Sequence, residues 1–186
     1  NTGEKQTTEA GNRHLHEDGD PHFWLDPVLA IRYVENIRDG LIRVDPEGKT
    51  IYDANTSNTI DKLLELDAWI RKELDVIPAE QRLLVTNDES LGYFADRYGF
   101  KVVGTIIPSF STNASPSAKE TAALVDVIHS RGVRAIFLET GANPTLAEQV
   151  SRETGIRVVS GLYTHSTSSP KGPAPTYFEM MKENTR

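Results

Sequence analysis

The chain contains no cysteine. This absence excludes disulfides, thiolate metal sites and catalysis by a thiol, so any metal must be bound by histidine, a carboxylate or a backbone oxygen. Long apolar runs are missing too: none reaches the ~18 residues that a membrane span requires, and the start does not resemble a signal peptide. We therefore expect no direct insertion of this chain into a membrane.

Basic residues are scarce as well. Lysine and arginine number 20 against 27 aspartates and glutamates, which gives a formal net charge of −7. Such a chain has no broad basic surface to bind phosphate groups, and this excludes nucleic acid as an expected partner. An acidic surface is better suited to binding cations.

What the chain does contain is enough apolar sequence for one good core, with 38% hydrophobic residues in 186. Residues 1–19 are polar and lack any apolar period, and we interpret them as a tail or a surface loop. Two helices are predicted between residues 27 and 76, the first with Asp26 as N-cap and Pro27 in its first turn. Its apolar stripe comprises Ala30, Val34, Ile37, Leu41 and Val44. The second helix, 47–76, exceeds the average of ~11–12 residues; its stripe comprises Ile60, Leu63, Leu66, Ile70 and Leu74.

After Pro78 the pattern alternates between strands and helices. Short apolar runs at 83–85, 102–103, 135–138 and 158–159 are separated or followed by helical stretches near 90–98, 116–131, 144–154 and 174–183. This alternation predicts an α/β fold with a parallel sheet of about four strands and flanking helices, preceded by the helical pair. Ligands of such sheets bind outside the carboxyl ends of the strands.

Three possible metal ligands follow the predicted strands: Asp88 in VTNDES, Glu139 in IFLET and His165 in GLYTHS. A fourth, His22, lies in DPHFWLDP, where a proline on each side restricts the backbone. Two imidazoles and two carboxylates suit Zn²⁺, Mn²⁺ or Fe²⁺ better than Ca²⁺ or Mg²⁺.

Structural roles are open to the same residues. His22 could be a buried histidine bonded to a backbone carbonyl, and Asp88 could cap the helix that follows it. His165 lies in a stretch rich in Ser, Thr, Pro and Gly, where a histidine is commonly solvated. Glu139 fits a structural acid, or one that orients a ligand, better than a direct ligand. Trp24 is interpreted as a core residue.

The segments DPHFWLDP, VTNDESLGYFADRYGF and GLYTHS…TYFEMMKENT resemble the solute-binding receptors of zinc and manganese ABC transporters, the cluster A-I family of metal-binding lipoproteins. The resemblance runs from about Asp20 to Asn184. It implies two α/β lobes joined by one long helix, with the metal in the cleft between them. Residues 20–46 would then be the remnant of an N-terminal lobe that is otherwise missing, 47–76 the linker helix, and 80–186 the C-terminal lobe.

Under this resemblance His22 matches the family's histidine ligand in DPHxW. Asp88 stands where the family has His or Glu, and His165 stands where it usually has Asp. The two departures are reciprocal and leave one imidazole and one carboxylate across the pair, which indicates a rearranged site in preference to a lost one. Glu139 matches a position that the family usually gives to an acid behind the ligands.

The resemblance implies a non-catalytic, extracytoplasmic receptor that captures a divalent transition metal for an ABC permease. It would be held at the periplasm or cell surface by a lipid anchor outside this chain. Zinc is favoured over manganese because imidazole-rich sites prefer zinc. Two other classes stay open. One is an adhesin-like interaction domain with a disused site; the other is a metal-dependent hydrolase, which would need an open coordination position and a base such as Glu139.

Overall fold

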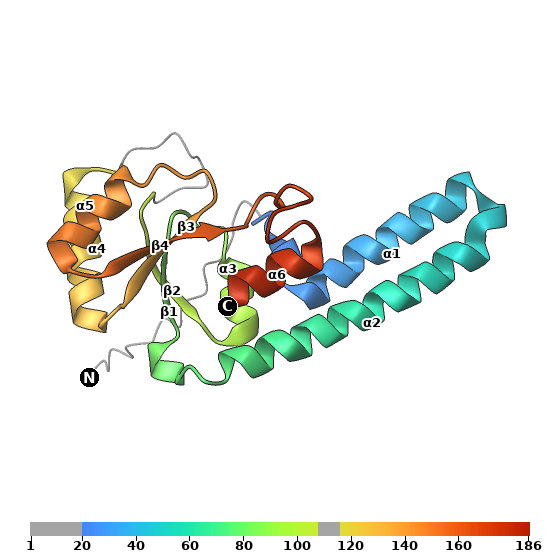
Figure 1. Cartoon of the computed structure of the whole chain (residues 1–186), viewed down its shortest axis with the longest axis horizontal. Helices are drawn as coiled ribbons and strands as arrows, with labels where there is room; N and C mark the ends of the chain where they lie inside the picture. Colours follow the sequence, from blue (N-terminus) through green and yellow to red (C-terminus); the bar gives the residue numbers. More distant parts are fainter. Residues whose placement is uncertain (1–19, 108–115) are drawn as a thin grey trace, which may run out of the picture.

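The computed structural model describes residues 20–107 and 116–186. The tail predicted for 1–19 lies outside these ranges. The elements follow one another in the order α1 (Pro27–Val44), α2 (Lys49–Leu74), β1 (Leu83–Thr86), α3 (Gly92–Tyr98), β2 (Lys101–Thr105), α4 (Ala118–Arg131), β3 (Ala135–Glu139), α5 (Thr145–Thr154), β4 (Arg157–Leu162) and α6 (Tyr177–Thr185) (Figure 1). No helix within the described ranges is both long and apolar enough to span a bilayer.

The four strands form one sheet in the order β2-β1-β3-β4, and every pairing is parallel. This confirms the predicted α/β fold, and each predicted apolar run lies inside a strand. Because all four strands point the same way, their carboxyl ends meet at one edge of the sheet. The residues that follow β1, β3 and β4 are therefore neighbours in space.

Both faces of the sheet are covered, because successive side chains of a strand point to opposite faces. Leu84 packs with residues of α2, α3 and α6, whereas its neighbour Val85 packs with residues of α4 and α5. Val85 and Ile136 are fully buried. The molecule therefore has two apolar layers with the sheet between them.

Helices α1 and α2 form an antiparallel hairpin that projects from this body (Figure 1). The Asp26 carboxylate caps α1 by accepting the N–H groups of Val28 and Leu29, and Pro27 occupies the first helical position, as predicted. The predicted stripe of α1 is only partly buried: Ala30 is covered, but Ile37 is 61% exposed and Val44 is 80% exposed. Within the described residues α2 is the main neighbour of α1, and one helix covers only part of so broad an apolar face.

A buried carboxylate joins the hairpin to the body. Asp67 on α2 accepts two hydrogen bonds of 2.8 Å from the Arg97 guanidinium and one of 3.0 Å from the Tyr98 hydroxyl. Arg97 also lies 3.3 Å from Asp26, the cap of α1. Burial acts to raise the pKa of Asp67, but the hydrogen bonds from Arg97, Tyr98 and Arg71 outweigh it and leave that pKa below its ordinary value.

Arg82 makes a second connection at the far end of α2. Its guanidinium donates to the carbonyl oxygens of Leu74, Ile77 and Tyr98 at 2.9–3.1 Å. Leu74 and Tyr98 end α2 and α3, whose last carbonyls have no partner inside their own helices. One side chain thus caps the carboxyl ends of two helices.

Candidate metal centre

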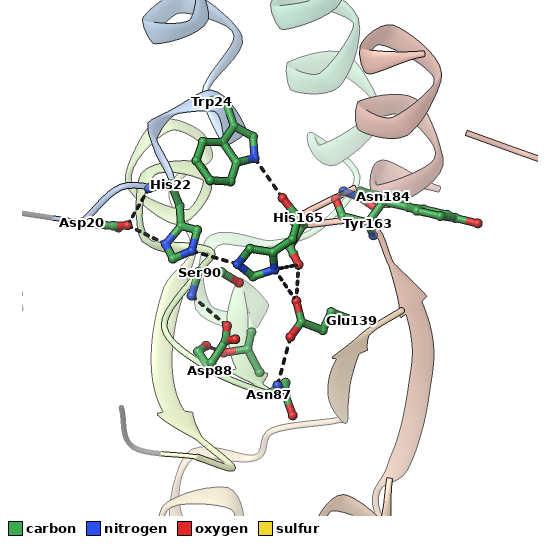
Figure 2. Close-up of polar contacts among 12 residues, drawn as sticks. Asp20, His22, Trp24, Asn87, Asp88, Ser90, Glu139, Tyr163, His165 and Asn184 are labelled. Carbon is green, nitrogen blue, oxygen red and sulfur yellow. Dashed lines mark hydrogen bonds and ion pairs between the residues drawn. The ribbon is translucent and has the colours of Figure 1, made fainter. Parts of the chain in front are cut away.

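The predicted site residues gather at the carboxyl edge of the sheet. Asp88 follows β1, Glu139 is the last residue of β3, and His165 follows β4. His22 comes from the other part of the chain, directly before a 3₁₀ turn at Phe23–Leu25 that leads into α1. The site therefore lies where the start of the hairpin meets the sheet (Figure 2).

Two imidazoles face each other across this junction. The Nε2 atoms of His22 and His165 lie 3.0 Å apart, although the residues are 143 positions apart in the chain. The rings are nearly perpendicular, at 82°, with centroids 5.0 Å apart. His22 is buried, whereas the His165 side chain is 47% exposed, so the pair is open to solvent from the His165 side.

Each imidazole is held by a carboxylate at its other nitrogen. Nδ1 of His22 lies 2.7 Å from Asp20 Oδ1, which also accepts the backbone N–H of His22. Nδ1 of His165 lies 2.7 Å from Glu139 Oε2. An ionised carboxylate only accepts hydrogen bonds, so in the neutral imidazoles the proton sits on Nδ1 and the lone pair on Nε2.

Glu139 is itself fixed by two neighbours. Asn87 Nδ2 donates to Oε1 at 3.2 Å, and the Thr164 hydroxyl donates to Oε2. Glu139 therefore acts here on the Nδ1 side of His165, where it sets the orientation of the ring.

Asp88 is buried at the same edge but does not join the pair. Its Oδ1 accepts the backbone N–H of Ser90 at 3.0 Å, and its carbonyl accepts the Thr86 hydroxyl at 2.6 Å. It thereby stabilises the turn before α3, which begins only at Gly92. Within residues 20–107 and 116–186, no three His, Asp or Glu side chains lie close enough together to bind one ion.

Three residues of this site were not singled out from the sequence. Asp20 forms a hydrogen bond with the His22 ring. Thr164 and Asn87 both donate hydrogen bonds to Glu139. Trp24 packs against the core as expected, and its indole N–H also donates to the Thr164 carbonyl at 2.8 Å. For Asp20 the signal was local, because an aspartate two residues before a histidine can reach that residue's backbone N–H and ring.

Comparison with known proteins adds an independent observation. Residues 2–186, almost the whole chain, match the family described as the zinc-uptake complex component A, periplasmic. The chain belongs to this family. The resemblance noted from the sequence motifs is thereby confirmed. The two facing histidines belong to a member of this family.

Individual relatives carry names that mention different metals. The manganese-binding lipoprotein MntA of Halalkalibacterium halodurans is 35% identical over 89% of this chain and 54% of its own length. The iron-binding protein YfeA of Yersinia pestis is 36% identical over 87% of this chain and 51% of its own. The periplasmic zinc-binding protein TroA of Treponema pallidum has a similar structure, with a TM-score of 0.81 at 25% identity over 95% of this chain and 65% of that one. The chain thus spans about half the length of these two curated relatives.

Proposed function

We propose that this chain is part of an extracytoplasmic receptor that captures a divalent transition metal and delivers it to the permease of an ABC uptake system, without catalysis. Its membership of the zinc-uptake family supports this function, as do the metal-binding names of its relatives. Those names describe binding proteins, so neither the adhesin-like domain nor the hydrolase is favoured.

The observation that carries the proposal is the arrangement of His22 and His165. With Nδ1 of each ring bound to a carboxylate, the two Nε2 atoms and their lone pairs face each other 3.0 Å apart. Two such lone pairs repel each other unless a cation or a proton lies between them. Two nitrogen ligands at ~2.0–2.1 Å from a tetrahedral zinc ion are about 3.3 Å apart, so a small outward movement admits the ion.

Four residues have distinct roles in this proposal. His22 and His165 bind the metal through Nε2, and Glu139 orients His165 as the outer acid of a carboxylate–histidine–metal arrangement. Asp88 supplies a carboxylate once it turns from the Ser90 N–H toward the ion. Its burial at the same edge supports this role.

Zinc is our proposed metal, with manganese second. The facing imidazoles favour zinc, whereas a larger share of carboxylate oxygens would favour manganese. The relatives named above include one that binds manganese, one that binds iron and one that binds zinc. Membership of the family therefore does not decide between zinc and manganese, and our proposal depends on the residues that would bind the ion.

We further propose another lobe, most of which lies outside the described residues and covers the exposed stripe of α1. Residues 20–46 would belong to that lobe, 47–76 to the linker helix and 80–186 to the second lobe. Exposed apolar side chains on one face of α1, at Tyr33, Ile37, Leu41 and Val44, support this arrangement. So does the greater length of the relatives.

Titration calorimetry on the metal-free chain tests the function. Zinc should bind more tightly than manganese, and either His22→Ala or His165→Ala should weaken zinc binding at least ten-fold. His129→Ala is the matched control, because His129 is exposed on α4, away from the site. Zinc affinity that survives both substitutions, or no zinc binding by the starting chain, would contradict the proposal.

The exchange of Asp88 and His165 has its own test. If both face one ion, the double change Asp88→His with His165→Asp should bind zinc better than either single change. Residues that share a partner typically couple by ~0.5–3 kcal/mol, whereas distant residues contribute additively. Additive losses in the double-mutant cycle would mean that Asp88 is not a ligand.

A further inference from the structure

Helix α6 contacts both chain segments that carry the facing histidines. The Tyr177 hydroxyl, in its first turn, donates to the Trp24 carbonyl at 2.7 Å. The Asn184 side chain, in its last turn, pairs with both backbone polar groups of Tyr163: Nδ2 donates to the carbonyl and Oδ1 accepts the N–H, each at 2.8 Å (Figure 2). Trp24 lies two residues after His22, and Tyr163 lies two residues before His165.

The two segments are also joined directly. Trp24 donates its indole N–H to the carbonyl of Thr164, the residue between Tyr163 and His165. The hydrogen bonds therefore form a closed circuit that runs from α6 to Trp24, on to Thr164 and Tyr163, and back to α6. In such a circuit the segment of one histidine cannot shift against the other without breaking at least one bond.

Asn184 supplies hydrogen-bond partners to the backbone that follows β4. Among the residues that the structure describes, this strand is at the edge of the sheet, so the backbone beyond it has no neighbouring strand on its outer side to pair with. The carboxamide of Asn184 offers one donor and one acceptor, as a peptide group of a neighbouring strand would. It thus fixes the backbone position from which His165 reaches the site.

Packing anchors α6 itself. Met180 is 4% exposed and Met181 is fully buried in the layer formed with α2 and α3. Burial raises the pKa of the Tyr177 phenol, so its hydroxyl keeps its proton and donates at any physiological pH. Packing therefore holds α6 against the body and supports its contacts with the two segments.

We propose that Tyr177 and Asn184 are positioning residues that set the separation between the Nε2 atoms of His22 and His165. This inference rests on the function proposed above, because the separation matters for binding only if both nitrogens bind one ion. Ligand sites require geometry held to within ~0.5 Å. Residues that act behind the ligands typically change metal affinity by ~10–100-fold when removed.

The test compares Asn184→Ala and Tyr177→Phe with Thr185→Val. Thr185 lies on the same helix, but its hydroxyl donates only to the Met181 carbonyl within α6, so it is a matched control. Zinc affinity should fall about ten-fold or more in Asn184→Ala, fall less in Tyr177→Phe, and stay unchanged in Thr185→Val. Tyr177→Phe keeps the buried ring, so it also serves as the test if Asn184→Ala does not fold.

A measurement without metal separates this inference from the proposed function. In protein with ¹⁵N-labelled histidine, the ring nitrogen signals of His22 and His165 should shift in Asn184→Ala and Tyr177→Phe, while those of His129 should not. Shifted signals in a chain that binds no zinc would support the positioning role and overturn the metal site. Ring signals and zinc affinity that match the Thr185→Val control would overturn the positioning role, even if melting temperatures fall.

Discussion

The hairpin and the α/β body use apolar residues in opposite ways. In the body both faces of the sheet are covered, and residues such as Ile136 are fully buried. On α1 the same kind of periodic apolar stripe ends in Ile37 and Val44, which are mostly exposed. An amphipathic period therefore shows which face of a helix is apolar. It does not show whether the surface that buries this face belongs to the same folded unit.

Helix α2 has buried apolar residues at one end and an exposed apolar residue near the other. Its last turns carry Leu66, Ile70 and Leu74, which are buried against α3 and α6, whereas Ile51 near its start is 65% exposed. The candidate site lies where the hairpin meets the body, with His22 just before α1 and His165 just after β4. Four measurements test whether the hairpin and the body differ in this way.

The largest effect is expected for Ile70→Ala. Ile70 is fully buried between α2 and the body, so its truncation leaves a cavity and should lower the free energy of unfolding by ~2–5 kcal/mol. Urea denaturation measures this loss. A cost below about 1 kcal/mol would mean that the end of α2 is not part of the core.

The next effect concerns the connection through Asp67. Asp67→Asn removes the charge that Arg97 and Tyr98 contact, and should lower the free energy of unfolding by ~1.5–3 kcal/mol. Asp61→Asn, at an exposed position of the same helix, is the control and should cost little. Equal effects of the two changes in urea denaturation would show that the connection contributes nothing.

The pH dependence of the same carboxylate gives a smaller and more specific signal. Because the pKa of Asp67 is lower in the folded protein than in the unfolded one, its contribution is complete at neutral pH. It should disappear as pH falls from the unfolded value, about 3.9, through the lower folded one. The difference in stability between the starting chain and Asp67→Asn should therefore shrink over this acid range, and a constant difference would contradict the assignment.

The smallest effect is expected for Ile37→Ser on the exposed stripe of α1. In this chain it should change the free energy of unfolding by no more than ~0.5 kcal/mol, because the side chain is already mostly in water. In a longer chain that contains the proposed additional lobe, the same change should cost clearly more. Equal costs in the two chains, measured by urea denaturation, would show that the lobe does not cover this face.

The sequence predicted the body well because its elements are specified locally. The runs at 83–85 and 135–138 are short and apolar and are followed by polar turns, so their strands could be placed almost to the residue. The long helix was also predicted, at 47–76, although residues 47 and 48 belong to a 3₁₀ turn at Pro46–Gly48 and α2 runs from Lys49 to Leu74. The boundaries of α6 were less accurate, because the loop before it contains prolines that fit a helix start as well as a turn.

The site was predicted only in part, for a different reason. That Asp88, Glu139 and His165 share one edge follows from the parallel sheet, and the structure confirms it. The contact between His22 and His165 joins residues 143 positions apart, and no local pattern specifies so distant a pairing. The contact of Asn184 with the backbone beyond β4 could not be predicted for the same reason. A polar residue near the end of a helix gives no indication of which backbone it will contact.

Arg82 and Asp67 together attach α2 to the body at two points. The Arg82 guanidinium binds the carboxyl ends of α2 and α3 together, and Asp67 binds α2 to α3 again further along. These two attachment points prevent α2 from rotating about its contact with the body. If the proposed ion capture involves opening and closing, that movement would have to bend the hairpin beyond Asp67, toward the turn at Asp45–Gly48, or shift α1 along α2. The carboxyl half of the long helix would then travel with the sheet as one rigid body, and the hinge would lie in the half whose apolar side chains are exposed.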